Sequence, residues 1–144
     1  VKSVNYTKIT ADPIEKVDSE VLGGKLRVSY DSYEASSLAS GSDITIGKIP
    51  TNATIMDVVL KCDALGGSST LAVGDSGDAD RYLAAVGTWN AAGQTQSMLG
   101  GSTAANTAMT GLGYRTTAET DIVITTGGAT TSGSIHCWVM YTVE

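Results

Sequence analysis

Three acidic residues that lie close together are the first candidates for chemistry in this sequence. Asp75, Asp78 and Asp80 fall within six positions, and calcium is commonly bound by several oxygen ligands from one loop. The segment lacks the Asp-x-Asp-x-Asp-Gly order and the distal glutamate of an EF-hand loop. Gly77 interrupts the acids and Arg81 follows them. We therefore interpret the segment as an acidic hairpin turn with a neighbouring ion-pair partner, and expect no metal.

The sequence offers little support for catalysis. His136 is the single histidine, which excludes a site built from several histidines, and no G-x-S-x-G elbow supports a Ser-His-Asp triad. Asp31 and Glu34 form a carboxylate pair of the kind that glycosidases use, but neighbouring acids are also common on strand edges. We expect a protein that is not an enzyme and has no cofactor, and keep a glycoside-acting enzyme using Asp31 and Glu34 as a third hypothesis.

Aromatic side chains suggest a binding function of another class. Tyr30, Tyr33, Tyr82 and Trp89 could line a sugar-binding face, because aromatic rings stack on the apolar faces of sugars. The alternative is that most of them belong to the core. A carbohydrate-binding module is accordingly the second hypothesis.

The sequence predicts that these side chains lie on or between β-strands. No ten-residue window has a strong helical stripe, whereas roughly eight short segments alternate or are rich in β-branched residues and end at Gly-rich turns. This pattern predicts an all-β, jelly-roll-like antiparallel β-sandwich over residues 23–144. The clearest segments are 25–30, 43–46, 54–62, 70–73, 81–86, 121–125 and 134–143.

Two of these strands make specific predictions about their faces. In 54–62, Met56, Val58, Leu60 and Cys62 are predicted to share one face, opposite Ile55, Asp57, Val59 and Lys61. In 134–143, the two faces carry Ile135, Cys137, Val139 and Tyr141 on one side and His136, Trp138 and Met140 on the other. Apolar residues on both faces predict burial on both sides, by the core and by a neighbour.

Residues 1–22 form a different kind of segment. Ile9, Ile14, Val17 and Val21 are separated by charges and by Pro13, and no regular period connects them. We predict an extended N-terminal arm that lies on another surface, ending at Gly23-Gly24.

The distribution of charge predicts a covered surface. The net charge is −6, which argues against nucleic acid as a partner, and no apolar run is long enough to span a membrane. Only Arg115, Glu119, Asp121 and Glu144 are charged after Arg81, and the 33 residues Tyr82–Tyr114 carry no charge. Interface cores are depleted in charge and enriched in Trp, Tyr and Met. We therefore predict that these residues contact another subunit: Trp89, Met98, Met109, Tyr114 and, from the last predicted strand, Trp138. The alternative is a set of uncharged Ala/Gly/Thr loops with a few core side chains.

Cys62 and Cys137 are the only cysteines, and they follow no metal-binding spacing. They could form a disulfide in an oxidising compartment, but we favour two free, half-buried thiols.

Several segments, in a fixed order, resemble small structural proteins of tailed bacteriophages. The resemblance covers about Gly23 to Met140. It is carried by GGKLRVSYDSYE at 23–34, IGKIP at 46–50, ALGGSSTLAVGD at 64–75, Asp80-Arg81, IVITTGG at 122–128 and SGSI at 132–135. The arm 1–22 and the segment 89–108 match least.

The family resembles capsid decoration, or cement, proteins, and the resemblance implies function and partners. Such proteins bind the outside of a shell of HK97-type major capsid protein and clamp adjacent subunits, and some assemble as dimers or trimers. The implied chain is a structural virion protein on the capsid exterior, made in the bacterial host cytoplasm, with the major capsid protein and itself as partners and a dimer favoured. The alternative is a carbohydrate-binding or head-fibre module that attaches the virion to its host.

Overall fold

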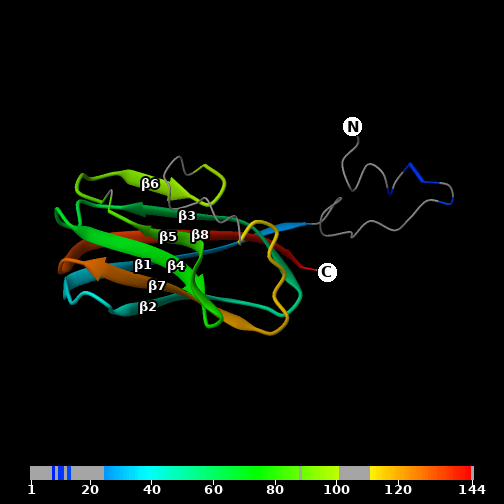
Figure 1. Ribbon diagram of the computed structural model, residues 1–144, viewed down its shortest axis with the longest axis horizontal. Coiled ribbons are helices and arrows are strands. Elements are labelled where there is room, and N and C mark those ends of the chain that lie inside the picture. Colours follow the sequence, from blue (N-terminus) through cyan, green and yellow to red (C-terminus); the bar gives the residue numbers. More distant parts are fainter. Residues whose placement is uncertain are drawn as a thin grey trace.

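The computed structural model describes residues 8, 10, 11, 13, 25–87, 89–100 and 111–143, and these residues form a β-sandwich. The predicted arm 1–22 therefore lies outside the described residues, apart from Lys8, Thr10, Ala11 and Pro13. Within the described part, two four-stranded antiparallel sheets stack face to face (Figure 1). No helix in this part of the chain is long and apolar enough to cross a membrane. The all-β prediction is confirmed.

The two sheets share the described strands equally. Sheet A has the order β1-β8-β3-β6, and sheet B has the order β2-β7-β4-β5. The bounds in sheet A are Leu26–Leu38 for β1, Thr131–Val143 for β8, Ala53–Cys62 for β3 and Gln94–Ser97 for β6. The bounds in sheet B are Asp43–Ile49 for β2, Thr120–Gly128 for β7, Ser69–Asp75 for β4 and Asp78–Val86 for β5.

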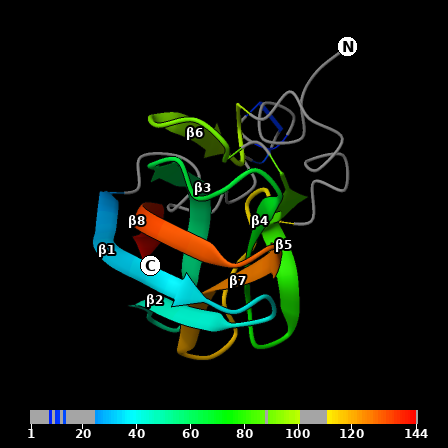
Figure 2. The same cartoon turned by 90° about the vertical axis from the view of Figure 1, so that its left-hand side faces the viewer.

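The strand pairing is nested, as a jelly roll requires. The first strand pairs with the last, β2 with β7, β3 with β6 and β4 with β5, so the chain behaves as one long hairpin rolled into two layers. The pairs β3–β8 and β4–β7 then complete the sheets. Figure 2 shows β1 at one edge of the molecule, next to β8.

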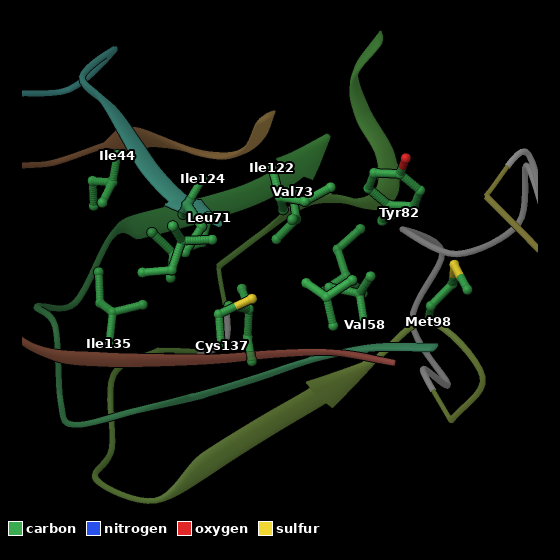
Figure 3. Close-up of a cluster of buried hydrophobic side chains, with 14 of the residues drawn as sticks. Ile44, Val58, Leu71, Val73, Tyr82, Met98, Ile122, Ile124, Ile135 and Cys137 are labelled. Atoms are coloured by element: carbon green, nitrogen blue, oxygen red, sulfur yellow. The ribbon is translucent and has the colours of Figure 1, made fainter. Parts of the chain in front are cut away.

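The core lies between the inner faces of the sheets. Figure 3 shows Ile135 and Cys137 of β8 pointing toward Leu71 and Ile124 of sheet B. These four side chains are almost completely buried, and burial of each of the three aliphatic ones stabilises the fold by about 1.5–3 kcal/mol. Both cysteines are free and buried, so the prediction of free thiols is confirmed, although they are fully rather than half buried.

A bulge in β3 corrects one predicted face. The pairing with β8 shifts between Ile55 and Asp57, so one extra residue enters β3 at this point. As a result Ile55 is fully buried, whereas Met56 is 38% exposed. The predicted shared face is correct for Val58, Leu60 and Cys62 but wrong for Met56, because the extra residue changes the phase of the alternation.

The acidic segment forms the β4–β5 hairpin, as predicted. The Asp75 side chain is 4% exposed, and its Oδ2 accepts hydrogen bonds from Arg81 Nε and the Tyr82 hydroxyl, both at 2.8 Å. Its Oδ1 accepts from the backbone amides of Gly77 at 2.9 Å and Asp78 at 3.2 Å. One buried carboxylate therefore holds the turn and the first residues of β5 together.

These hydrogen bonds determine the protonation state of the cluster. Burial by itself raises the pKa of Asp75, but hydrogen bonds from Arg81, Tyr82 and Gly77 outweigh burial and hold that pKa below its usual range. Burial, followed by the hydrogen bond to Asp75, raises the pKa of Tyr82. Asp75 is therefore ionised and Tyr82 neutral at pH 7.

The Asp75→Asn variant is expected to be less stable than the wild type by about 1–3 kcal/mol at pH 7, because Arg81 and Tyr82 lose a charged acceptor. Urea unfolding measures this difference. The folded-state pKa of Asp75 is lowered from 3.8, so its contribution is fully present above pH 3.8 and is lost as the pH falls through the folded-state value. The exposed Asp80→Asn variant is the control, and an equal loss in both variants would contradict the assignment.

The two thiols are expected to be unreactive in the folded protein. Burial raises the pKa of Cys62 and of Cys137 to about 12, so almost no thiolate forms at pH 8. A chromogenic disulfide reagent should react with neither residue in buffer and with both in denaturant. Rapid reaction of one thiol under native conditions would show that its strand opens locally.

Candidate interaction surface

The outer face of sheet A, which points away from the core, carries a cluster of apolar side chains. We call the following residues the outer patch: Leu26, Val28 and Tyr30 of β1, Trp138 and Met140 of β8, and Val59 of β3. The strand register aligns Tyr30, Trp138 and Val59 in one row across the sheet. Leu26, Val28 and Tyr30 are 54%, 55% and 52% exposed, whereas Trp138, Met140 and Val59 are half-buried. No described strand covers this face.

Strand β1 has its apolar residues on the outer side rather than the core side. Its alternate residues pair with the inward-facing residues of β8, so the polar set lies on the core side: Arg27, Ser29, Asp31 and Tyr33. Arg27 and Asp31 remain exposed despite this orientation, because β1 is an edge strand of sheet A. Among the residues of β1, only Ala35 is buried. The apolar side of β1 is therefore available to a partner.

Three rings form an ordered cluster at the centre of the outer patch. The ring centroids of Tyr30 and Trp138 are 5.0 Å apart, and those of His136 and Trp138 are 6.1 Å apart. The planes of Tyr30 and His136 differ by only 7°, and the Tyr30 hydroxyl and His136 Nδ1 are hydrogen-bonded at 2.9 Å. This bond and the ring contacts fix the rings before any partner binds, which lowers the entropy cost of binding.

A shallow hollow of about 360 Å³ opens beside the rings. Tyr30, His136 and Trp138 line it together with Lys61, Cys62, Asp63 and Gly93. The hollow combines aromatic rings with one cationic and one anionic side chain at its margin. This composition suits a contact surface with an apolar centre and a polar rim.

The predicted contact residues lie in different environments. Trp138 belongs to the outer patch. Trp89 and Met98 are in the core, with 0% and 7% exposure, so neither presents its side chain at the surface of this chain. Tyr114 is half-buried, and the Arg81 guanidinium carbon lies 4.1 Å from its ring centroid. Met109 and the predicted arm residues Ile9, Ile14, Val17 and Val21 lie outside the described residues.

The candidates for other chemistry are not assembled into sites. Asp31 and Glu34 are three positions apart on one strand and so point to opposite faces, and Glu34 is hydrogen-bonded to Ser134. Tyr82 and Trp89 are buried, so they cannot form a sugar-binding face with Tyr30 and Tyr33. No cluster of three or more His, Cys, Asp or Glu side chains among the described residues is arranged to hold a metal ion.

The exposed apolar residues of β1 were visible in the sequence as an alternating pattern, but their role was not. Alternation shows that Leu26, Val28 and Tyr30 share a face, and not whether that face is inside or outside. The residues on the other face of the strand are more informative, because two of them, Arg27 and Asp31, are charged. Charges on the core side are typical of an edge strand, and this pattern favours an edge position for β1.

Of three comparisons with known proteins, only the comparison with solved structures found matches. No protein-family model and no curated protein matches this chain. Among solved structures, the chain is similar to one in the capsid asymmetric unit of cyanophage Pam1, with 27% sequence identity and a TM-score of 0.66, over 85% of this chain and 88% of that one.

Two further capsid structures contain chains of the same fold. A chain in the capsid of Ralstonia phage GP4 is 18% identical with a TM-score of 0.60, over 84% of this chain and 86% of that one. A chain in the acid-stable capsid of Helicobacter pylori bacteriophage KHP30 is 10% identical with a TM-score of 0.59, over 82% and 87%. The jelly-roll sandwich described above is thus similar to chains found in the capsids of three phages.

Proposed function

We propose that this protein is a non-enzymatic component of a phage capsid, and more specifically a decoration protein that binds the outside of the shell and clamps adjacent major capsid subunits. The observation that carries the proposal is the match to the Pam1 capsid chain, which combines 27% identity with near-complete coverage of both chains. The sequence segments that resemble phage cement proteins support the same assignment.

The lengths of the matched chains favour a small separate subunit. The coverage of this chain and of the matched chains is nearly equal, at 82–85% against 86–88%. The matched chains therefore consist of little beyond the sandwich. A chain of this kind suits an accessory subunit that is added to a shell.

The two outer faces of the sandwich differ in a way that suits attachment to a surface. On sheet B, Lys48 Nζ lies 3.1 Å from Glu119, and the Thr125 hydroxyl donates to Asp43 at 2.8 Å. Such exposed polar pairs contribute little to stability and are typical of a solvated face. Sheet A instead presents the outer patch. We infer that sheet A contacts capsid subunits and that sheet B faces solvent.

The outer patch generates the first test of capsid binding. The double variant Trp138→Ala, Met140→Lys should bind purified shells that lack the protein at least about tenfold more weakly than the wild type, because an aromatic anchor is lost and a charge enters the contact. Co-sedimentation with the shells measures the occupancy. The matched control is Lys48→Ala on sheet B. Equal binding of the double variant would contradict the role of sheet A, and no binding of the wild type would contradict the decoration function.

The predicted arm generates a separate test. Replacing Ile9, Ile14, Val17 and Val21 with serine should weaken shell binding while the body keeps its thermal unfolding midpoint, because the arm is proposed to dock on a neighbouring subunit. Binding to many repeated sites makes individually weak contacts sufficient, so dissociation rates on intact shells are the sensitive measurement. An unchanged dissociation rate would assign docking to the body alone.

A further inference from the structure

The free edge of β1 is the longest sheet edge in the described structure. Its pairing with β8 is unbroken over ten residues, from Leu26 to Ala35, and no described strand pairs with its other side. We propose that this edge pairs with β1 of a second copy of the chain, antiparallel and centred on Ser29, to form a twofold dimer. The proposal does not depend on the capsid role.

The other three edge strands each carry a feature that discourages pairing. β6 has only four residues. β2 has a register shift between Thr45 and Gly47, and β5 has two shifts in its pairing with β4. Short strands and bulges are common protections against edge-to-edge association. β1 has neither over 26–35, and it contains no proline or glycine. Its protective feature is a pair of inward-pointing charges, Arg27 and Asp31, which disfavour pairing with an unlike strand. An edge that is long, regular and apolar on one side is expected to be covered by a partner.

The sequence of β1 is complementary to itself in one register. With Ser29 opposite the Ser29 of the second copy, Arg27 lies opposite the other copy's Asp31, and Val28 lies opposite the other copy's Tyr30. The twofold axis repeats each pair, which gives two ion pairs on the core side and two apolar pairs on the outer side. Directly opposed residues of opposite charge, and aromatic residues opposed to β-branched ones, are the favourable cross-strand pairs.

The present environment of these residues leaves them available for such pairing. Arg27 and Asp31 are both exposed, and Arg27 makes no ion pair with any described residue. The Asp31 Oδ1 atom accepts a hydrogen bond from the Ser32 backbone amide at 2.8 Å. A neighbouring side chain thus satisfies this amide in the single chain, and a second β1 strand can replace it with a carbonyl oxygen.

A second copy is favoured over an unrelated strand because of this charge pattern. An isologous contact requires that the same surface complement itself, and the pair Arg27 and Asp31 is spaced symmetrically about Ser29. The twofold axis of an antiparallel pair is perpendicular to the sheet. Two copies of sheet A therefore become one continuous eight-stranded sheet, with both outer patches on the same side.

The experiment uses the purified full-length chain without shells, so its result is separate from that of the capsid-binding tests. Analytical ultracentrifugation should show a reversible dimer for the wild type. Arg27→Asp and Asp31→Arg, each alone, should raise the dimer dissociation constant at least about tenfold, because like charges become opposed at two places. The double variant Arg27→Asp, Asp31→Arg should restore the dimer, since it exchanges the charges. Circular dichroism checks that each variant is folded.

A cysteine pair tests the register directly. Ser29→Cys should form a disulfide-linked dimer under mild oxidation, because residue 29 lies opposite its own copy. Ser32→Cys, on the same strand, lies opposite Leu26 of the other copy and should not cross-link. A wild type that remains monomeric at every soluble concentration, or cross-linking that is equal at positions 29 and 32, would overturn the proposal. A chain that dimerises without recovery in the charge-exchange variant would also overturn it.

Discussion

The pairing of β8 with both β1 and β3 determines the arrangement of sheet A and of the core beneath it. β8 runs through the interior of sheet A, so its register sets the positions of both neighbours. Its inward residues Ile135, Cys137 and Val139 pack against sheet B, whereas Trp138 and Met140 face outward. Since successive side chains of a strand point to opposite faces, a slip of one residue would exchange the core for the outer patch. Stability and the interaction surface therefore rest on the same register.

Alternation in the sequence was sufficient to predict most strands and the fold class, because a half-buried strand repeats every two residues. Alternation was not sufficient to predict which residues share a face in a strand with a bulge, or to find a strand without apolar residues. The predicted face of β3 was wrong at Met56, because a bulge adds one residue and reverses the phase. β6 was not predicted, because Gln94–Ser97 contains no apolar residue and so shows no hydrophobic alternation. The Asp75–Arg81 pair was predictable because both partners are close in sequence.

The uncharged stretch Tyr82–Tyr114 illustrates a limit of composition as a guide to surfaces. In the described part of this stretch, Tyr82, Leu83, Trp89 and Met98 are buried in the core. A stretch without charged residues is expected to avoid water, but it can do so either in a protein core or in an interface. The most exposed apolar strand lies instead in the charge-rich part of the chain, where Arg27 and Asp31 alternate with Val28 and Tyr30. Averages over long windows conceal such a strand, because the charges and the apolar residues occupy opposite faces.

The proposed dimer and the proposed attachment to a shell support each other through geometry. A twofold axis perpendicular to sheet A places both outer patches on one side of the pair, and both polar sheet B faces on the other. Two patches that face the same way can contact two neighbouring sites on a repetitive surface at once. The second contact then forms at a high effective concentration, so a modest affinity for each site becomes a slow dissociation of the pair. A clamp between subunits requires only this arrangement, and neither a deep pocket nor a catalytic group is needed. An edge strand with charges on one side and apolar residues on the other can thus serve two contacts, one with its own copy and one with the shell.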